Sequence, residues 1–140
     1  KPMARKSARA AAVQMVFENM LGGDGGEDTL RGLIEFTPEG EDQDFIDGIL
    51  AGVEAHGEEL DQAIEKNLKG WTLDRISKVD QAVLRVAIYE MCFDGTTPDP
   101  VVINEAVALA QRFDTPQAGK FVNGVLSAVL AEKNAQGAMA

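Results

Sequence analysis

Cysteine, histidine and long apolar runs are nearly absent from this chain of 140 residues. One cysteine, Cys92, excludes an internal disulfide, and its apolar neighbours predict a buried structural thiol rather than a nucleophile or metal ligand. No apolar run is long enough to cross a bilayer, and the basic start does not resemble a signal peptide. We therefore expect a cytoplasmic protein with no membrane partner.

Motifs for catalysis are also missing. The single histidine, His56, has no cysteine or second histidine nearby with which to form a metal site, and the acids around it are typical of a solvated surface. The glycine-rich segment 22–26 lacks the Lys-Ser/Thr that follows a phosphate-binding loop. The sequence thus predicts no enzyme, no catalytic residue, no metal and no cofactor.

Positive charge is scarce and unevenly placed. The formal net charge is -10, yet residues 1–17 sum to +4 without an anion, residues 18–65 sum to -14, and residues 66–140 sum to zero. A polyanion would have to meet a local basic patch, because the whole chain repels it. We expect the start of the first helix to expose cations for phosphate contact, although a frayed, solvated terminus explains the charge pattern about equally well. The patch comprises Lys1, Arg5, Lys6 and Arg9.

Apolar residues recur at helical spacing, and no segment alternates as a strand would. The chain is expected to be a single all-α domain over residues 1–140 with seven or so helices. The expected helices run over about 4–21, 27–36, 42–55, 57–70, 79–91, 102–113 and 116–133, followed by a frayed tail over 137–140.

The helix expected over 79–91 has two notable features. Ser77 and Asp80 have the spacing of a capping box at its start. Beyond them the helix is apolar nearly all round, which predicts a central buried position and requires Glu90 to be paired or at the helix edge. In the last helix Gly124 costs about 1 kcal/mol against alanine, for which close packing of another helix is the favoured explanation and approach of RNA the alternative.

Three blocks carry a resemblance to a known family: VDQAVLRVAIYE at 79–90, VINEAVALA at 102–110 and KFVNGVL at 120–126. They closely resemble the bacterial NusB family of transcription antitermination factors, and the likeness covers essentially the whole chain. It implies a compact all-α bundle of two packed helical halves that binds RNA without catalysis. It further implies binding to boxA-type single-stranded RNA together with the small-subunit ribosomal protein NusE, in ribosomal RNA operons. Other Nus factors and RNA polymerase would be indirect partners.

The resemblance also suggests site residues. Lys1, Arg5, Lys6 and Arg9 match the family's arginine-rich start, and Lys120 and Phe121 begin a second matching motif. Phe17 either stacks on a base or fills the core, the core being favoured. Neutral Gln117 lies in a loop where many relatives place an acid, so we hypothesise that it favours RNA binding. Exposed polar residues around the fifth helix are candidates for the protein partner, namely Arg75, Asp80 and Gln81.

Two alternative functions remain open from the sequence. One is a NusB-like RNA-binding module cut from a ribosomal RNA cytosine methyltransferase. The other is a helical protein-protein adaptor that never touches RNA. The sequence does not decide the oligomeric state, and a homodimer is one of the options.

Overall fold

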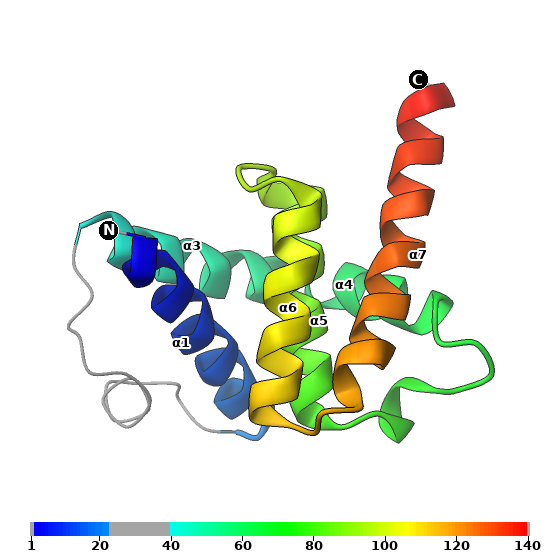
Figure 1. Cartoon of the computed structure of the whole chain (residues 1–140), viewed down its shortest axis with the longest axis horizontal. Helices are drawn as coiled ribbons and strands as arrows, with labels where there is room; N and C mark the ends of the chain where they lie inside the picture. The colour runs from blue at the N-terminus through cyan, green and yellow to red at the C-terminus, as the bar shows by residue number, and fades with distance from the viewer. Residues whose placement is uncertain (1, 23–39, 140) are drawn as a thin grey trace.

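The computed structural model describes residues 2–22 and 40–139, and within these ranges every regular element is helical (Figure 1). The expected all-α class is thereby confirmed, whereas the helix expected over 27–36 lies outside the described residues. The described helices are α1 (Pro2–Met20), α3 (Glu41–Ala55), α4 (Gly57–Lys66), α5 (Lys78–Tyr89), α6 (Asp99–Phe113) and α7 (Ala118–Met139), with short turns η1 (Leu73–Arg75) and η2 (Glu90–Asp94).

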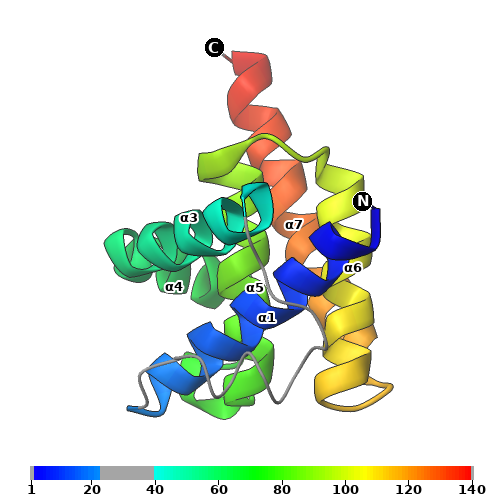
Figure 2. The ribbon, with the colours of Figure 1, turned by 90° about the vertical axis from the view of Figure 1, so that its left-hand side faces the viewer.

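Helix α5 lies at the centre of the bundle, as its apolar sequence predicted. It contacts α1, α3, α4, α6 and α7, and most of its side chains are buried. Helix α1 packs against α3, and α6 packs against α7, which gives two helical groups. In Figure 1, α1 and α3 lie at the left, α6 lies in front of α5, and α7 lies at the right. Figure 2 shows α1 and α3 crossing in front of α5. Burial of α5 between the two helical groups joins them into one core.

Helix ends differ modestly from the expected ones. Helix α4 ends at Lys66, and Leu68 is buried in the turn that follows. Helix α6 begins at Asp99 with Pro100 in its first turn, where a missing N–H costs nothing. Helix α7 continues through Met139 instead of fraying near residue 137.

The chain leaves α5 through η2, a π-helical turn that ends at Gly95 with φ of +72°. A π-turn holds more residues than an α-turn, so it rotates the side chains that follow it. Met91 is buried, whereas Cys92 and Phe93 are exposed. The prediction that Cys92 is a buried thiol is therefore wrong, because apolar neighbours in sequence do not decide which way a side chain points after the π-turn.

Candidate RNA-binding site

The basic start of α1 keeps one well-exposed cation among the described residues. The Lys6 side chain is 59% exposed, and its Nζ lies 3.2 Å from Oε2 of Glu105 on α6. Such a surface pair contributes little to stability and leaves the ammonium available to a phosphate. Lys1 lies outside the described residues.

Arg5 is held against α3 rather than standing free in solvent. Its guanidinium lies 4.1 Å from the centroid of the Phe45 ring, and the side chain is only partly exposed. The buried Nε finds no hydrogen-bond acceptor among the described residues. Stacking on the ring orients this guanidinium while leaving it without a carboxylate partner in that part of the chain.

Arg9 corrects the sequence-based picture. It is only 5% exposed, and its guanidinium donates two hydrogen bonds to Glu90, from Nε to Oε2 at 2.7 Å and from Nη2 to Oε1 at 2.8 Å. Burial lowers the pKa of Arg9, but the hydrogen bond and charge of Glu90 outweigh this and raise it. The expected exposure of Arg9 is wrong, because Arg9 pairs with the buried Glu90 at the end of α5 and therefore lies in the core. The pairing expected for Glu90 is confirmed.

Phe17 lies further along α1, partly buried against the main core. This position agrees with the favoured interpretation of Phe17 as a core ring. The exposed positive charge of α1 is therefore confined to its first turns.

The start of α7 carries the second predicted group. The Thr115 hydroxyl accepts a hydrogen bond from the Ala118 N–H at 3.2 Å and so caps the start of α7. Gln117 and Lys120 are exposed, while Phe121 is partly buried. Lys6 contacts α6 at Glu105, whereas the start of α7 follows the end of α6 at Phe113. These two positions of α6 are about 12 Å apart along the helix axis, so the two basic groups are well separated. An RNA strand would have to be several nucleotides long to contact both groups.

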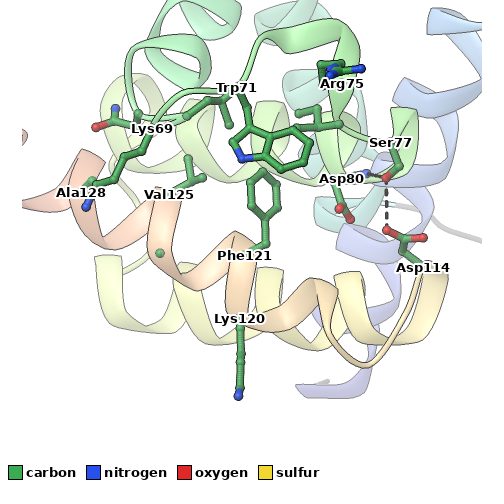
Figure 3. Close-up of a pocket in the computed structure, with 14 residues that line it drawn as sticks. Lys69, Trp71, Arg75, Ser77, Asp80, Asp114, Lys120, Phe121, Val125 and Ala128 are labelled. Atoms are coloured by element: carbon green, nitrogen blue, oxygen red, sulfur yellow. Dashed lines mark hydrogen bonds between the residues drawn. The ribbon is translucent and has the colours of Figure 1, made fainter.

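Phe121 lines a pocket of about 600 Å³ between α7 and the connection from α4 to α5. We call it the Trp71 pocket, because the Trp71 side chain, 59% exposed, forms its opposite wall (Figure 3). Sequence reasoning missed Trp71, although a lone tryptophan after Gly70, outside any helix, was a usable signal. The lining residues are Asn67, Leu68, Lys69, Trp71, Arg75, Ile76, Ser77, Asp80, Asp114, Lys120, Phe121, Gly124, Val125 and Ala128.

Asp80 brings a buried carboxyl group to the Trp71 pocket. Its backbone N–H donates to the Ser77 hydroxyl at 3.0 Å, which confirms the predicted cap of α5. The side chain is part of a residue only 6% exposed, and Oδ1 has no hydrogen-bond partner among the described residues. Burial, together with hydrogen bonding to Asp114 and its negative charge, raises the pKa of Asp80 to about 7. Asp114 in turn accepts a hydrogen bond from the Ser77 hydroxyl at 3.2 Å (Figure 3).

Two of the three residues expected to present polar groups to a protein partner are not exposed. Asp80 and Gln81 are buried, and only Arg75 is exposed as expected. Gln81 Nε2 donates to Oδ1 of Asp61 on α4 at 3.2 Å, and Arg85 donates two hydrogen bonds to the same carboxylate. The expected exposure of Asp80 and Gln81 is wrong, because the elements that pack on α5 cover these two positions.

Gly124 also lines the Trp71 pocket, and its surroundings exclude the packing explanation. A Cβ added there would meet no atom of the described structure within 4 Å. Close approach of a neighbouring helix is therefore not the reason for this glycine. The open space beside it belongs to the pocket.

Other kinds of site find little support. Within the described ranges, no three His, Cys, Asp or Glu side chains gather as they would around a metal ion. The helices described in the structure include none with the length and apolar character needed to cross a membrane. The chemistry that these residues offer is cation contact, ring stacking and hydrogen bonding.

Comparison with known proteins gives a consistent family. The NusB family model matches residues 6–131. The transcription antitermination protein NusB of Acetivibrio thermocellus is 39% identical over 132 residues, which cover 94% of this chain and 91% of that protein. These relatives are transcription antitermination proteins, which agrees with the prediction that this chain is not an enzyme.

Solved structures agree with the sequence relatives. NusB of T. maritima superposes with a TM-score of 0.79 at 32% identity, covering 91% of each chain. A chain in the crystal structure of the antitermination factors NusB and NusE in complex with double-stranded RNA gives a TM-score of 0.77 at 28% identity, covering 92% of this chain and 97% of that one. The family model, the sequence relatives and the fold together place this chain in the NusB family of transcription antitermination factors.

Proposed function

We propose that this chain, acting as a single RNA-binding domain over residues 1–140, binds boxA-type single-stranded RNA together with the ribosomal protein NusE. It would act in the cytoplasm on ribosomal RNA operons, with other Nus factors and RNA polymerase as indirect partners. The observation that carries the proposal is the similarity, over 92% of this chain, to a structure that combines NusB, NusE and RNA.

The exposed cations support contact with RNA phosphates. Lys6 and Lys120 are both exposed on helix starts, and the competing bond from Lys6 to Glu105 is a weak surface pair. Each phosphate that such a cation neutralises releases counterions and makes affinity depend on salt. Because Arg9 is withdrawn into the core, the basic patch is smaller than its sequence suggests. Binding by this chain alone should accordingly be weak.

The acidic remainder of the chain supports a basic protein partner. Helix α3 presents exposed carboxylates at Glu41, Asp44, Asp47 and Glu54. Complementary charge speeds the encounter of two proteins and favours their correct orientation. A basic ribosomal protein would gain from this field and would add RNA contacts that the chain itself lacks.

The test is a salt titration of a fluorescent boxA-like single strand, with and without NusE. Lys6→Ala and Lys120→Ala should weaken binding, and each should reduce the slope of log affinity against log salt by about 0.7, the value for one phosphate on a single strand. Lys66→Ala is a matched control, because Lys66 is 65% exposed and pairs with Glu132 in the way that Lys6 pairs with Glu105.

The alternatives predict different outcomes. An adaptor that never touches RNA would bind NusE or another protein but show no RNA affinity under either condition. A module from a methyltransferase would bind RNA equally well without NusE. Sedimentation of the same samples would show whether a homodimer forms.

A further inference from the structure

Phe45 on α3 connects the basic start of α1 to the interior of the protein. We propose that Phe45 is a positioning residue for RNA binding, whose ring holds the Arg5 guanidinium with its two Nη groups directed at a phosphate. This inference rests on the proposed function and adds to it a residue that lies outside every motif that indicated RNA binding.

The geometry of Arg5 leaves one edge of its guanidinium available. Its Cζ lies 4.1 Å from the centroid of the Phe45 ring, well within the distance of about 6 Å over which a ring attracts a cation. Of the guanidinium nitrogens, Nε alone is enclosed by protein without a hydrogen-bond partner among the described residues. The two Nη groups are not enclosed in this way, so they can donate to a ligand.

The ring that holds Arg5 is itself firmly placed. Phe45 is partly buried and packs against both hydrophobic clusters of the core, of which the smaller joins Ala8 and Ala11 of α1 to Ile46 of α3. In Figure 1 the first turns of α1 and of α3 lie together at the left. The position of the ring is therefore set by the packing of the two helices, not by its contact with Arg5.

A second arginine contacts the same ring but is already neutralised. The Arg9 guanidinium lies 5.3 Å from the Phe45 centroid and donates two hydrogen bonds to the buried Glu90. Arg5 has no carboxylate partner among the described residues. The ring thus lies between one cation that is bound in the core and one that is available to an anion.

Holding Arg5 in place should raise its affinity for RNA without adding charge. A free arginine side chain loses rotamer freedom when it binds, whereas one stacked on a ring has lost much of that freedom beforehand. A guanidinium that presents two Nη groups can also donate two hydrogen bonds to one phosphate. The expected contribution of Phe45 is therefore to the geometry of the contact.

The experiment measures binding of a fluorescent boxA-like single strand to the whole chain with NusE at low salt. Phe45→Leu should weaken binding about 2- to 10-fold, because Arg5 must then be ordered during binding. Phe45→Tyr keeps the face of the ring and should bind as wild type does. Phe45→Leu removes no charge, so the slope of log affinity against log salt should stay at the wild-type value. Arg5→Ala, in contrast, should reduce that slope by about 0.7.

Two comparisons separate positioning from loosened packing. If Phe45 acts through Arg5, Phe45→Leu should weaken binding no further when Arg5→Ala is already present. Leu50→Ala is the matched control, because Leu50 is also a partly buried residue of α3 that packs against both clusters. Leu50→Ala should lower stability in urea denaturation and leave RNA affinity at the wild-type value.

Nuclear magnetic resonance tests the geometry in the absence of RNA. The ring current of Phe45 should shift the Hε signal of Arg5 upfield in the wild type. Phe45→Leu should return this signal to the position of an ordinary arginine, and Phe45→Tyr should preserve the shift.

Three results would overturn the positioning role. If the wild type shows no upfield shift of Arg5 Hε, the ring does not hold the guanidinium in solution. If Phe45→Leu binds RNA as wild type does, or weakens binding equally when Arg5→Ala is present, Phe45 acts at most through packing and the proposed function still stands. If the wild type binds no RNA with or without NusE, the proposed function itself fails, whether or not the shift is observed.

Discussion

Arg9 of α1 and Glu90 of η2 form a two-bond ion pair in the interior of the protein, although 81 residues separate them in sequence. Neither residue is more than 5% exposed, and the Arg9 guanidinium also lies 5.3 Å from the Phe45 ring centroid. The pair connects α1 to the end of α5 and gives the Glu90 carboxylate a partner in a place where an unpaired carboxylate would be very unfavourable.

Removing one member of this pair should be strongly destabilising. We expect Glu90→Gln to lower the free energy of unfolding by about 3–5 kcal/mol, because the buried Arg9 charge loses its partner. The double variant Arg9→Met/Glu90→Leu should recover much of that loss, since no buried charge remains. Urea denaturation measures both. A cost below about 1 kcal/mol for Glu90→Gln would show that the pair is solvated.

Two glycines of α3 should respond in opposite ways to alanine. A Cβ at Gly52 would lie 2.1 Å from the Tyr89 ring, whereas a Cβ at Gly48 would meet nothing within 4 Å in the described structure. Gly52→Ala should destabilise the protein by about 1–3 kcal/mol, because the Tyr89 ring must leave its place against α3. Gly48→Ala should stabilise it by about 0.5–1 kcal/mol. Thermal unfolding followed by circular dichroism distinguishes the two, and equal effects would contradict the close contact of Gly52 with Tyr89.

Asp80 should make stability fall as pH rises. Its pKa increases from 3.8 to about 7 on folding, mainly through burial, so the folded state retains a proton that the unfolded chain releases. The stabilisation is fully present below the unfolded pKa and is lost as pH rises through the folded pKa, by at most about 1.4 kcal/mol per pH unit. Urea unfolding across this window should show a smaller decline for Asp80→Asn than for wild type. Identical declines would mean that Asp80 is ionised throughout.

Gln117 tests the role of charge at the start of α7. Gln117→Asp adds an anion to an exposed position three residues before Lys120. If RNA passes there, affinity should fall by a few tenths to about 1 kcal/mol, and the loss should shrink at high salt. Gln62→Asp, at an exposed position of α4, is the control for the same change in net charge. Equal RNA affinities of Gln117→Asp and wild type at low salt would contradict the hypothesis.

The helices were accessible from sequence because their signals are local. Apolar spacing predicted the described helices to within a few residues at most ends, and the Ser77 hydroxyl caps α5 as its spacing indicated. Helix α7 continues past its expected end, where alanine, glutamine and methionine favour helix even though Gly137 does not. The family blocks lie in α5, α6 and α7, which form much of the core, so the resemblance and the fold agree.

The site was less accessible, because exposure depends on segments distant in sequence. The sequence predicted that Arg9 is a surface cation, because its partner Glu90 is distant in sequence. Asp80 and Gln81 looked like exposed polar positions until α4 and α7 covered them. A lone tryptophan outside a helix is a signal in the sequence, but nothing in the chain near residue 71 indicates that Phe121 lies next to it.

The sequence by itself determined the helical class, the family and the location of the scarce positive charge, since these follow from local spacing, composition and motif. Tertiary structure alone decided which charges remain available. It buried Arg9 against Glu90, left Lys6 and Lys120 at the surface, and buried the carboxyl group of Asp80 beside a pocket that Trp71 and Phe121 also line. Burial and pairing are properties of helices brought together by folding, and no single stretch of sequence records them.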